Sequence, residues 1–192
     1  MLTRLKSNLQ EWGQIKASLQ PRNRFIIDLA ETILVSILIV LLFRQCLFQS
    51  SKVVSGSMIS TLMINDRVIV SKYPFRFRTP QRGDIVLFNS PLGDKKEYVK
   101  RIIGVGGDTV RITNGRVYIN EAPLFFPGAV IRKDYFNLDS KTIPEDHYFV
   151  LGDNRRNSHD SRYWDNPFVP HSELIGQANF IYWPLSRAQV LR

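Results

Sequence analysis

Cysteine and histidine are nearly absent from the 192-residue sequence, which has one cysteine, Cys46, and three histidines. A single cysteine cannot form an intramolecular disulfide, and the Cys and His residues do not stand at the spacing of metal ligands. His147, His159 and His171 have polar or proline-bearing neighbours, which is typical of histidines at the surface. We therefore expect neither a disulfide framework nor a metal site.

Acidic residues are scarce relative to basic ones, 17 against 26, so the formal net charge is +9. Such a surplus attracts a nucleic acid or an anionic membrane surface. The basic residues are spread along the chain, however, without the compact basic run that is typical of nucleic-acid binding. We expect a solvated, mildly basic surface and no nucleic-acid partner.

One long hydrophobic run, FIIDLAETILVSILIVLLF, occupies residues 25–43. At a rise of about 1.5 Å per residue, a helix of this length nearly matches the roughly 30 Å hydrocarbon layer of a bilayer. From Ile33 to Phe43 apolar residues cover every face of such a helix, whereas a buried core helix shows an apolar stripe. The following residues, FRQCLFQ, do not resemble a signal-peptide cleavage site. We predict a retained transmembrane anchor over residues 25–48, with a buried core helix as the alternative.

The charges around this run give a mild preference for its orientation. Residues 1–24 carry five basic residues and one acidic residue, although Arg44 and Lys52 follow the run. The positive-inside rule then favours a cytoplasmic N-terminus. We predict a single-pass membrane protein with residues 1–24 in the cytoplasm and residues 49–192 on the opposite side of the membrane.

Beyond Phe48, apolar residues recur with a period near two in short segments separated by Gly, Pro, Asn and Asp, which is typical of strands. The segments are RVIVSKY, GDIVLFNS, EYVKRIIG, DTVRIT, GRVYIN, HYFVLGD and GQANFIYW. TVRIT and RVYIN flank Asn114-Gly115, which predicts a tight hairpin. The fold class is therefore mainly β after an N-terminal helix. The least strand-like part is 121–147, and we expect a small second lobe at about 113–147.

Lys100 is the most informative candidate for chemistry. Alternation along EYVKRIIG puts it on the same face as Tyr98 and Ile102, in an apolar setting. Burial lowers the pKa of a lysine from about 10.4, and a neutral lysine can act as the general base for a serine nucleophile. The alternative is a lysine whose ammonium reaches water.

Four other motifs are ambiguous. The hydroxyls of VVSGSMISTL, at residues 53–62, belong to a polar linker or to a nucleophile. Ser158, His159 and Asp160 are adjacent in sequence, and adjacent side chains cannot form a catalytic relay. GVGGD at 104–108 leads into a strand, so we interpret it as a tight turn and not as a phosphate site. Alternating charges in GDNRRNSHDSRYW, residues 152–164, predict a structured polar loop with bidentate ion pairs, with a solvated loop as the alternative.

Five features in this order resemble the type I signal peptidase family, membrane-bound serine proteases that remove signal peptides. They are the run at 25–43, SGSMISTL, RGDIVLF, YVKRIIGVGGD and GDNRRNSHDSR, and together they span about 25–176. The resemblance implies that Ser57 is the nucleophile and Lys100 the general base. It implies that the Ser55 hydroxyl and the Ser57 N–H form the oxyanion hole, and that Ser158 orients the lysine amine.

The same resemblance assigns supporting roles and a substrate class. Asp160 and Arg162 match a structural ion pair beside the site, and Asp153 and Arg155 are expected to brace the same loop. Family substrates are precursor proteins with small residues, typically Ala, at the first and third positions before the cut, and no cofactor is needed. Residues expected near the pockets for them, with plain core as the alternative, are Val53, Met58, Leu62 and Val99. Besides these precursors, the expected partner is the lipid bilayer.

Two positions depart from the family pattern, which commonly has Pro where this chain has Val54 and Ser60. Each change frees a backbone that Pro would hold at φ near −65°. Two rival functions stay open. One is a self-cleaving Ser/Lys protease of the repressor type, although such proteins carry a DNA-binding region where this chain has the predicted span. The other is a membrane-tethered β-domain that binds peptides without catalysis.

Overall fold

The computed structural model describes residues 11, 14, 17–18, 20–126 and 134–191. The chain divides into two compact units, residues 1–45 and 46–192. Most of the predicted cytoplasmic segment 1–24, and residues 127–133 of the predicted second lobe, lie outside the described residues.

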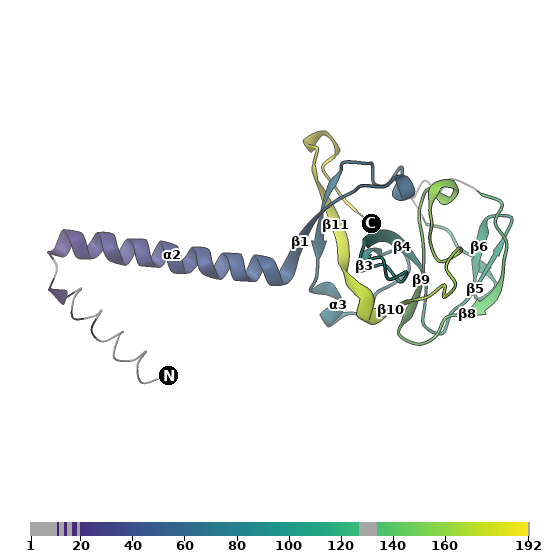
Figure 1. Cartoon of the computed structure of the whole chain (residues 1–192), viewed down its shortest axis with the longest axis horizontal. Helices are drawn as coiled ribbons and strands as arrows, with labels where there is room; N and C mark the ends of the chain where they lie inside the picture. The colour runs from purple at the N-terminus through teal and green to yellow at the C-terminus, as the bar shows by residue number, and fades with distance from the viewer. Residues whose placement is uncertain (1–10, 12–13, 15–16, 19, 127–133, 192) are drawn as a thin grey trace. The chain divides into compact units, whose positions relative to one another are not determined.

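The first unit consists mainly of the helix α2, Pro21–Leu47 (Figure 1). It contains the whole hydrophobic run and begins at a proline, whose missing N–H and fixed φ suit the first turn of a helix. The predicted anchor ended at Phe48, which is instead the first residue of a strand. Within the described part of the chain, no helix reaches the combined length and apolarity of a membrane span. The membrane anchor therefore stays a prediction.

The second unit is built on an eight-stranded sheet in the order β1-β2-β11-β3-β4-β9-β10, with β12 paired to β11. All its described strand pairings are antiparallel. The strands are β1 Phe48–Lys52, β2 Arg67–Ser71, β3 Ile85–Asn89, β4 Glu97–Val105, β9 His147–Leu151, β10 Val169–Pro170, β11 Leu174–Trp183 and β12 Gln189–Val190. The connecting segments include the helix α3, Pro74–Phe77, and four single 3₁₀ turns: η1 Gly56–Met58, η2 Arg155–Asn157, η3 His171–Glu173 and η4 Leu185–Arg187.

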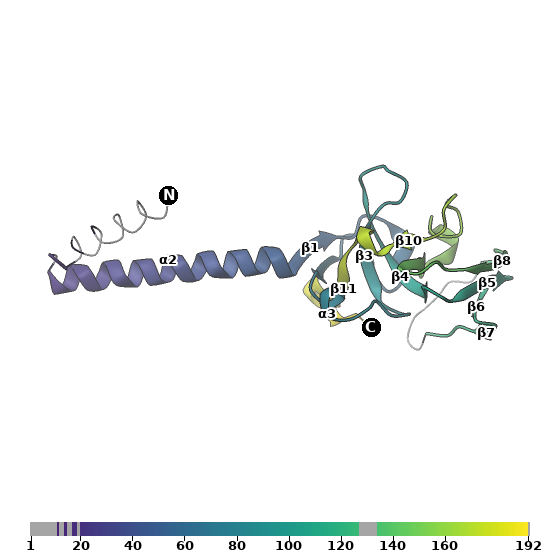
Figure 2. The ribbon, with the colours of Figure 1, turned by 90° about the horizontal axis from the view of Figure 1, so that it is seen from below.

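A smaller four-stranded sheet has the order β7-β6-β5-β8. Its strands are β5 Thr109–Thr113, β6 Arg116–Ile119, β7 Ala122–Pro123 and β8 Leu138–Thr142, and Figures 1 and 2 both place it at the end of this unit away from β11. The predicted hairpin is confirmed: Asn114 and Gly115 have φ of 48° and 74°, and Val110 lies opposite Ile119. The predicted turn at 104–108 is also confirmed, since Gly107 has φ 84° and β5 follows directly.

All seven predicted strand segments form strands, and the strands that were missed have weak patterns. β1 and β8, with the sequences FQSSK and LDSKT, carry one large apolar residue each. β8 lies in the part called least strand-like, 121–147, and pairs with β5 through a long-range register that its own sequence does not reveal. β7, β10 and β12 are only two residues long.

Three apolar clusters form the core, and two strands are buried on both faces to join them. In β3, Ile85 and Leu87 pack into one cluster, and the alternating Val86 and Phe88 pack into another. In β9, Phe149 packs into a third cluster, which belongs to the small sheet. The opposite face of β9 packs into the cluster that contains Val86 and Phe88. This continuous packing fixes the position of β4, which lies between β3 and β9.

Candidate active site

Ser57 lies in the single turn η1, which is fixed to the body by its neighbours. The turn follows Ser55, whose backbone is extended, and the next side chain, Met58, is fully buried in the core cluster of β2 and β11. Ser57 itself is 6% exposed. Its Oγ lies 3.3 Å from the Ser55 Oγ, so the two hydroxyls share a hydrogen bond.

Lys100 lies in β4, which contacts η1. Its exposed fraction is 3%, so the alternative of a lysine that reaches water is wrong. Tyr98 and Ile102 pack into the same core cluster, and the Lys100 Nζ lies 5.7 Å from the centre of the Tyr98 ring. The alternation of the strand thus predicts the setting of this side chain correctly.

The setting of Lys100 changes its proton affinity. Burial lowers the pKa of its ammonium to about 8, because a charged group loses its hydration inside the protein. The Asp160 carboxylate opposes this effect, Arg162 adds to it, and Asp153 opposes it. About a tenth of Lys100 is therefore neutral at pH 7 and about half at pH 8, and the neutral form is the one that a general base requires.

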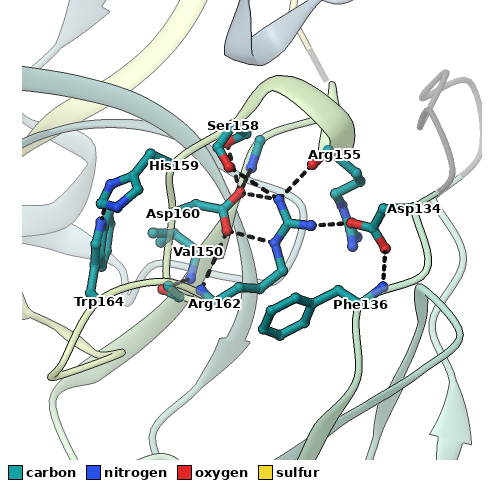
Figure 3. Close-up of polar contacts among 11 residues, drawn as sticks. Asp134, Phe136, Val150, Arg155, Ser158, His159, Asp160, Arg162 and Trp164 are labelled. Carbon is teal, nitrogen blue, oxygen red and sulfur yellow. Dashed lines mark hydrogen bonds and ion pairs between the residues drawn. The ribbon is translucent and has the colours of Figure 1, made fainter.

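Asp160 and Arg162 form the predicted ion pair beside these residues (Figure 3). The guanidinium donates from Nε to Asp160 Oδ1 at 2.8 Å and from Nη2 to Oδ2 at 3.0 Å, which is a bidentate contact. Figure 3 shows the same guanidinium between Asp160 and Asp134, with which it forms a second ion pair. Ser158 donates its hydroxyl proton to Asp160 Oδ2 at 2.7 Å. The predicted structured loop is therefore present.

The other predicted pair of this loop is arranged differently. Asp153 is buried and accepts two hydrogen bonds from Arg101, at 2.9 and 2.8 Å, and not from Arg155. Arg155 accepts a hydrogen bond from Arg162 through its carbonyl, and its own Nη1 is buried without a partner among the described residues. Burial, and secondarily the charge of Arg162, lower the pKa of Arg155 to about 10. The predicted bidentate network thus joins Asp153 to β4.

The histidines take no part in this arrangement. His159 is exposed, stacks on Tyr163, and accepts a hydrogen bond from Trp164 Nε1 at 3.0 Å, so Ser158, His159 and Asp160 form no relay. His171 contacts the Tyr148 hydroxyl through Nδ1 at 2.9 Å. The described residues contain no group of three or more His, Cys, Asp and Glu side chains that could hold a metal ion.

A groove of about 260 Å³ opens beside Ser57. Three of the four predicted pocket residues, Val53, Met58 and Val99, line it, whereas Leu62 lies in the core and not among the lining residues. Sequence reasoning missed several members of this surface. The lining residues are Ser51, Lys52, Val53, Val54, Ser55, Ser57, Met58, Leu87, Lys96, Glu97, Tyr98 and Val99. The groove is large enough for small side chains of an extended peptide that approaches Ser57.

Gly152 and Asn154 are two further residues that sequence reasoning did not single out for the site. A Cβ atom on Gly152 would lie 2.5 Å from the Ser57 carbonyl oxygen and 2.3 Å from the Ser158 Oγ. Asn154 donates its backbone N–H to the Ser57 carbonyl oxygen at 2.9 Å. The structure therefore brings Ser57, Ser158 and Lys100 to one region, although the described hydrogen bonds include none between Ser57 Oγ and Lys100 Nζ.

The chain is similar in sequence to known proteins of one family. The family described as Signal peptidase, peptidase S26, matches residues 26–183. The chain is 36% identical over 182 residues to the Probable signal peptidase I-2 of Synechocystis sp. strain PCC 6803, with 89% of this chain and 79% of that protein covered. It is 38% identical over 164 residues to the Signal peptidase I of Leptolyngbya laminosa, with 82% and 79% covered. The solved structure of a signal peptidase I from Enterococcus faecalis V583 is 35% identical to this chain in sequence. The match covers 52% of this chain and 97% of the Enterococcus chain, with a TM-score of 0.43.

Proposed function

The chain belongs to the peptidase S26 family of signal peptidases, and we propose that it cleaves signal peptides from precursor proteins with Ser57 as nucleophile and Lys100 as general base. The observation that carries this assignment is the buried Lys100, whose pKa lies near 8, on the strand that contacts the turn of Ser57. A lysine is rarely buried, because burial disfavours its charged form, and a strongly lowered pKa is typical of functional sites.

The first half of the reaction is an acyl transfer. Neutral Lys100 accepts the proton of the Ser57 hydroxyl while Ser57 Oγ attacks the scissile carbonyl. The developing oxyanion is stabilised by the Ser57 N–H and the Ser55 hydroxyl, which turns from its 3.3 Å contact with Ser57 Oγ toward the new charge. Protonated Lys100 then donates its proton to the leaving amine, the amide bond breaks, and the signal peptide stays attached to Ser57 as an ester.

Water completes the reaction. Lys100, again neutral, removes a proton from a water molecule that attacks the ester, and Ser57 leaves with that proton as the signal peptide departs with a free carboxylate. The Ser158 hydroxyl, held by Asp160, orients the lysine amine in this proposal. Arg162 in turn fixes Asp160, and Arg101 fixes Asp153 and joins the loop to β4.

The groove supplies the specificity in this proposal. Val53, Met58 and Val99 form apolar walls, which favour small apolar side chains at the first and third positions before the cut. The substrates are therefore precursors that end their signal in Ala-x-Ala. Residues 25–48 anchor the enzyme in a membrane, residues 1–24 lie in the cytoplasm, and the body 49–192, with the small lobe at about 113–147, acts on the opposite side. Tethering raises the concentration of enzyme at the surface where precursors emerge.

Cleavage of a defined precursor tests the proposed function. The full-length chain in detergent is expected to cut a precursor after its Ala-x-Ala sequence, and mass spectrometry of the mature product identifies the bond. A matched precursor with bulky Leu in place of both Ala residues is expected to stay intact, because the family resemblance predicts pockets that accept only small side chains. Tight binding of the first precursor without any cleavage would favour a peptide-binding domain and contradict the proposal.

The pH dependence of cleavage follows from the lowered pKa of Lys100. Because the neutral amine is the active form, kcat/KM is expected to rise about tenfold per pH unit below pH 8 and to level off above it. Initial rates at low substrate between pH 5.5 and pH 9.5 measure this profile. A profile that is flat through this range contradicts the role of Lys100 as the base.

A further inference from the structure

Asn154 clamps the turn that contains Ser57 by two separate hydrogen bonds. Its side-chain Nδ2 donates to the carbonyl oxygen of Gly56 at 2.9 Å, and its backbone N–H donates to the carbonyl oxygen of Ser57, also at 2.9 Å. The exposed fraction of Asn154 is 5%, so both bonds are shielded from water. Two successive carbonyl groups of η1 are thus held by one residue from the distant loop after β9.

The side-chain bond also determines the direction of an N–H group. The carbonyl of Gly56 and the N–H of Ser57 belong to the same planar peptide unit, and in a trans unit they point in opposite directions. When Asn154 Nδ2 fixes the carbonyl oxygen of Gly56, it directs the Ser57 N–H away from Asn154. In the proposed mechanism this N–H is the backbone donor that stabilises the oxyanion.

Asn154 is itself held firmly enough to act as such a support. The preceding residue, Asp153, is buried and paired with Arg101 on β4. The carbonyl oxygen of Asn154 accepts a hydrogen bond from the Asn157 N–H at 2.9 Å, which closes η2. The amide of Asn154 therefore projects from a rigid base toward η1, and η1 and η2 are in contact.

We propose that Asn154 is a positioning residue for catalysis: its side-chain amide orients the Gly56–Ser57 peptide so that the Ser57 N–H meets the oxyanion. This inference rests on the proposed function, and it concerns the transition state more than the bound substrate. An oxyanion donor contributes little to ground-state binding, and its loss lowers kcat by about 10²- to 10³-fold in other acyl-transfer enzymes. Misdirecting a donor that is still present has a smaller effect than removing it.

The variant Asn154→Ala in the full-length chain is expected to lower kcat for precursor cleavage about 10- to 100-fold, while KM changes by less than about twofold. A peptide aldehyde ending in Ala-x-Ala forms a tetrahedral adduct with the serine and needs the same donor. Its inhibition constant is expected to rise by the same factor as kcat falls. The pH profile should keep its midpoint near pH 8, because Lys100 is unchanged.

Asn154→Asp provides a second variant of nearly the same shape, because a carboxylate cannot donate to the Gly56 carbonyl. It is expected to show the same kcat loss. Asn166→Asp is the matched control: its Oδ1 accepts from the Phe168 N–H, and an aspartate keeps this acceptor, so activity should not change. Thermal unfolding of all three variants separates catalysis from folding.

The outcomes distinguish this inference from the proposed function. If both Asn154 variants keep full kcat and Ser57→Ala is inactive, the inference is wrong and the proposed function stands. If Ser57→Ala still cleaves the precursor, the proposed function itself is wrong. A rise in KM without loss of aldehyde affinity also overturns the inference. So does failure of both Asn154 variants to fold, which would show that the residue is only structural.

Discussion

Replacing Lys100 by methionine is expected to lower precursor cleavage by about 10³-fold or more, since losing one member of a nucleophile–base pair removes most of the catalytic effect. Methionine matches the length and volume of the lysine stem, so the buried position stays filled. Lys100→Arg keeps a positive charge but cannot supply a neutral amine, because the guanidinium stays protonated near neutral pH. Both variants should therefore be inactive, and activity in Lys100→Arg would show that charge, not basicity, matters.

Ser57→Ala is expected to cause a loss of the same size, because no other hydroxyl lies in η1. Ser60→Ala is the matched control: Ser60 belongs to the same stretch, is exposed, and is expected to be dispensable. Rates with a purified precursor measure both variants. Equal activity in Ser57→Ala and Ser60→Ala would show that Ser57 is not the nucleophile.

Gly152→Ala is expected to remove most activity although it adds only one methyl group. The new Cβ would lie 2.3 Å from the Ser158 Oγ and 2.5 Å from the Ser57 carbonyl oxygen, far inside van der Waals contact. The Ser158 side chain can rotate, but the Ser57 carbonyl belongs to the backbone and moves only with the nucleophile. Overpacking of this kind destabilises a protein by about 1–3 kcal/mol, so the variant is expected to fold with a lower Tm.

Two comparisons sharpen the test of Gly152→Ala. Gly93→Ala adds a methyl group where nothing lies within 4 Å, and its strain comes only from a φ of 72°, so it should lower Tm slightly and keep activity. The double variant Gly152→Ala with Ser158→Gly removes one of the two clashes. It should stay less active than Ser158→Gly, because the contact with Ser57 remains. If the double variant is as active as Ser158→Gly alone, the contact between the new Cβ and the Ser57 carbonyl does not impair catalysis, and the prediction is wrong.

The parts of the site that the sequence predicts are those with a local pattern. The alternation of β4 places Lys100 beside Tyr98, and Asn114-Gly115 defines a hairpin by the φ values that such a turn requires. The alternating charges of the loop predict bidentate ion pairs, and the family resemblance assigns one of them to Asp160 and Arg162, which do form it.

The remaining parts depend on long-range packing. Asp153 pairs with Arg101, 52 positions earlier, and not with the nearby Arg155, because the loop after β9 returns over β4. The bond from Asn154 to Gly56 joins residues 98 positions apart. Leu62 was expected near the pocket and instead fills the core, since a loop sequence does not reveal which way each side chain points.

The buried Lys100 also couples proton binding to folding. In the unfolded chain its pKa returns to the ordinary value near 10.5, whereas in the folded chain it is about 8. Between these two pH values the unfolded chain binds one more proton, so the free energy of unfolding rises with pH by up to about 3 kcal/mol from this group alone. Below pH 8 Lys100 is protonated in both states, and the desolvated ammonium then destabilises the folded state by its full amount. The base form that catalysis requires is thus also the form that the fold prefers, and alkaline conditions favour both.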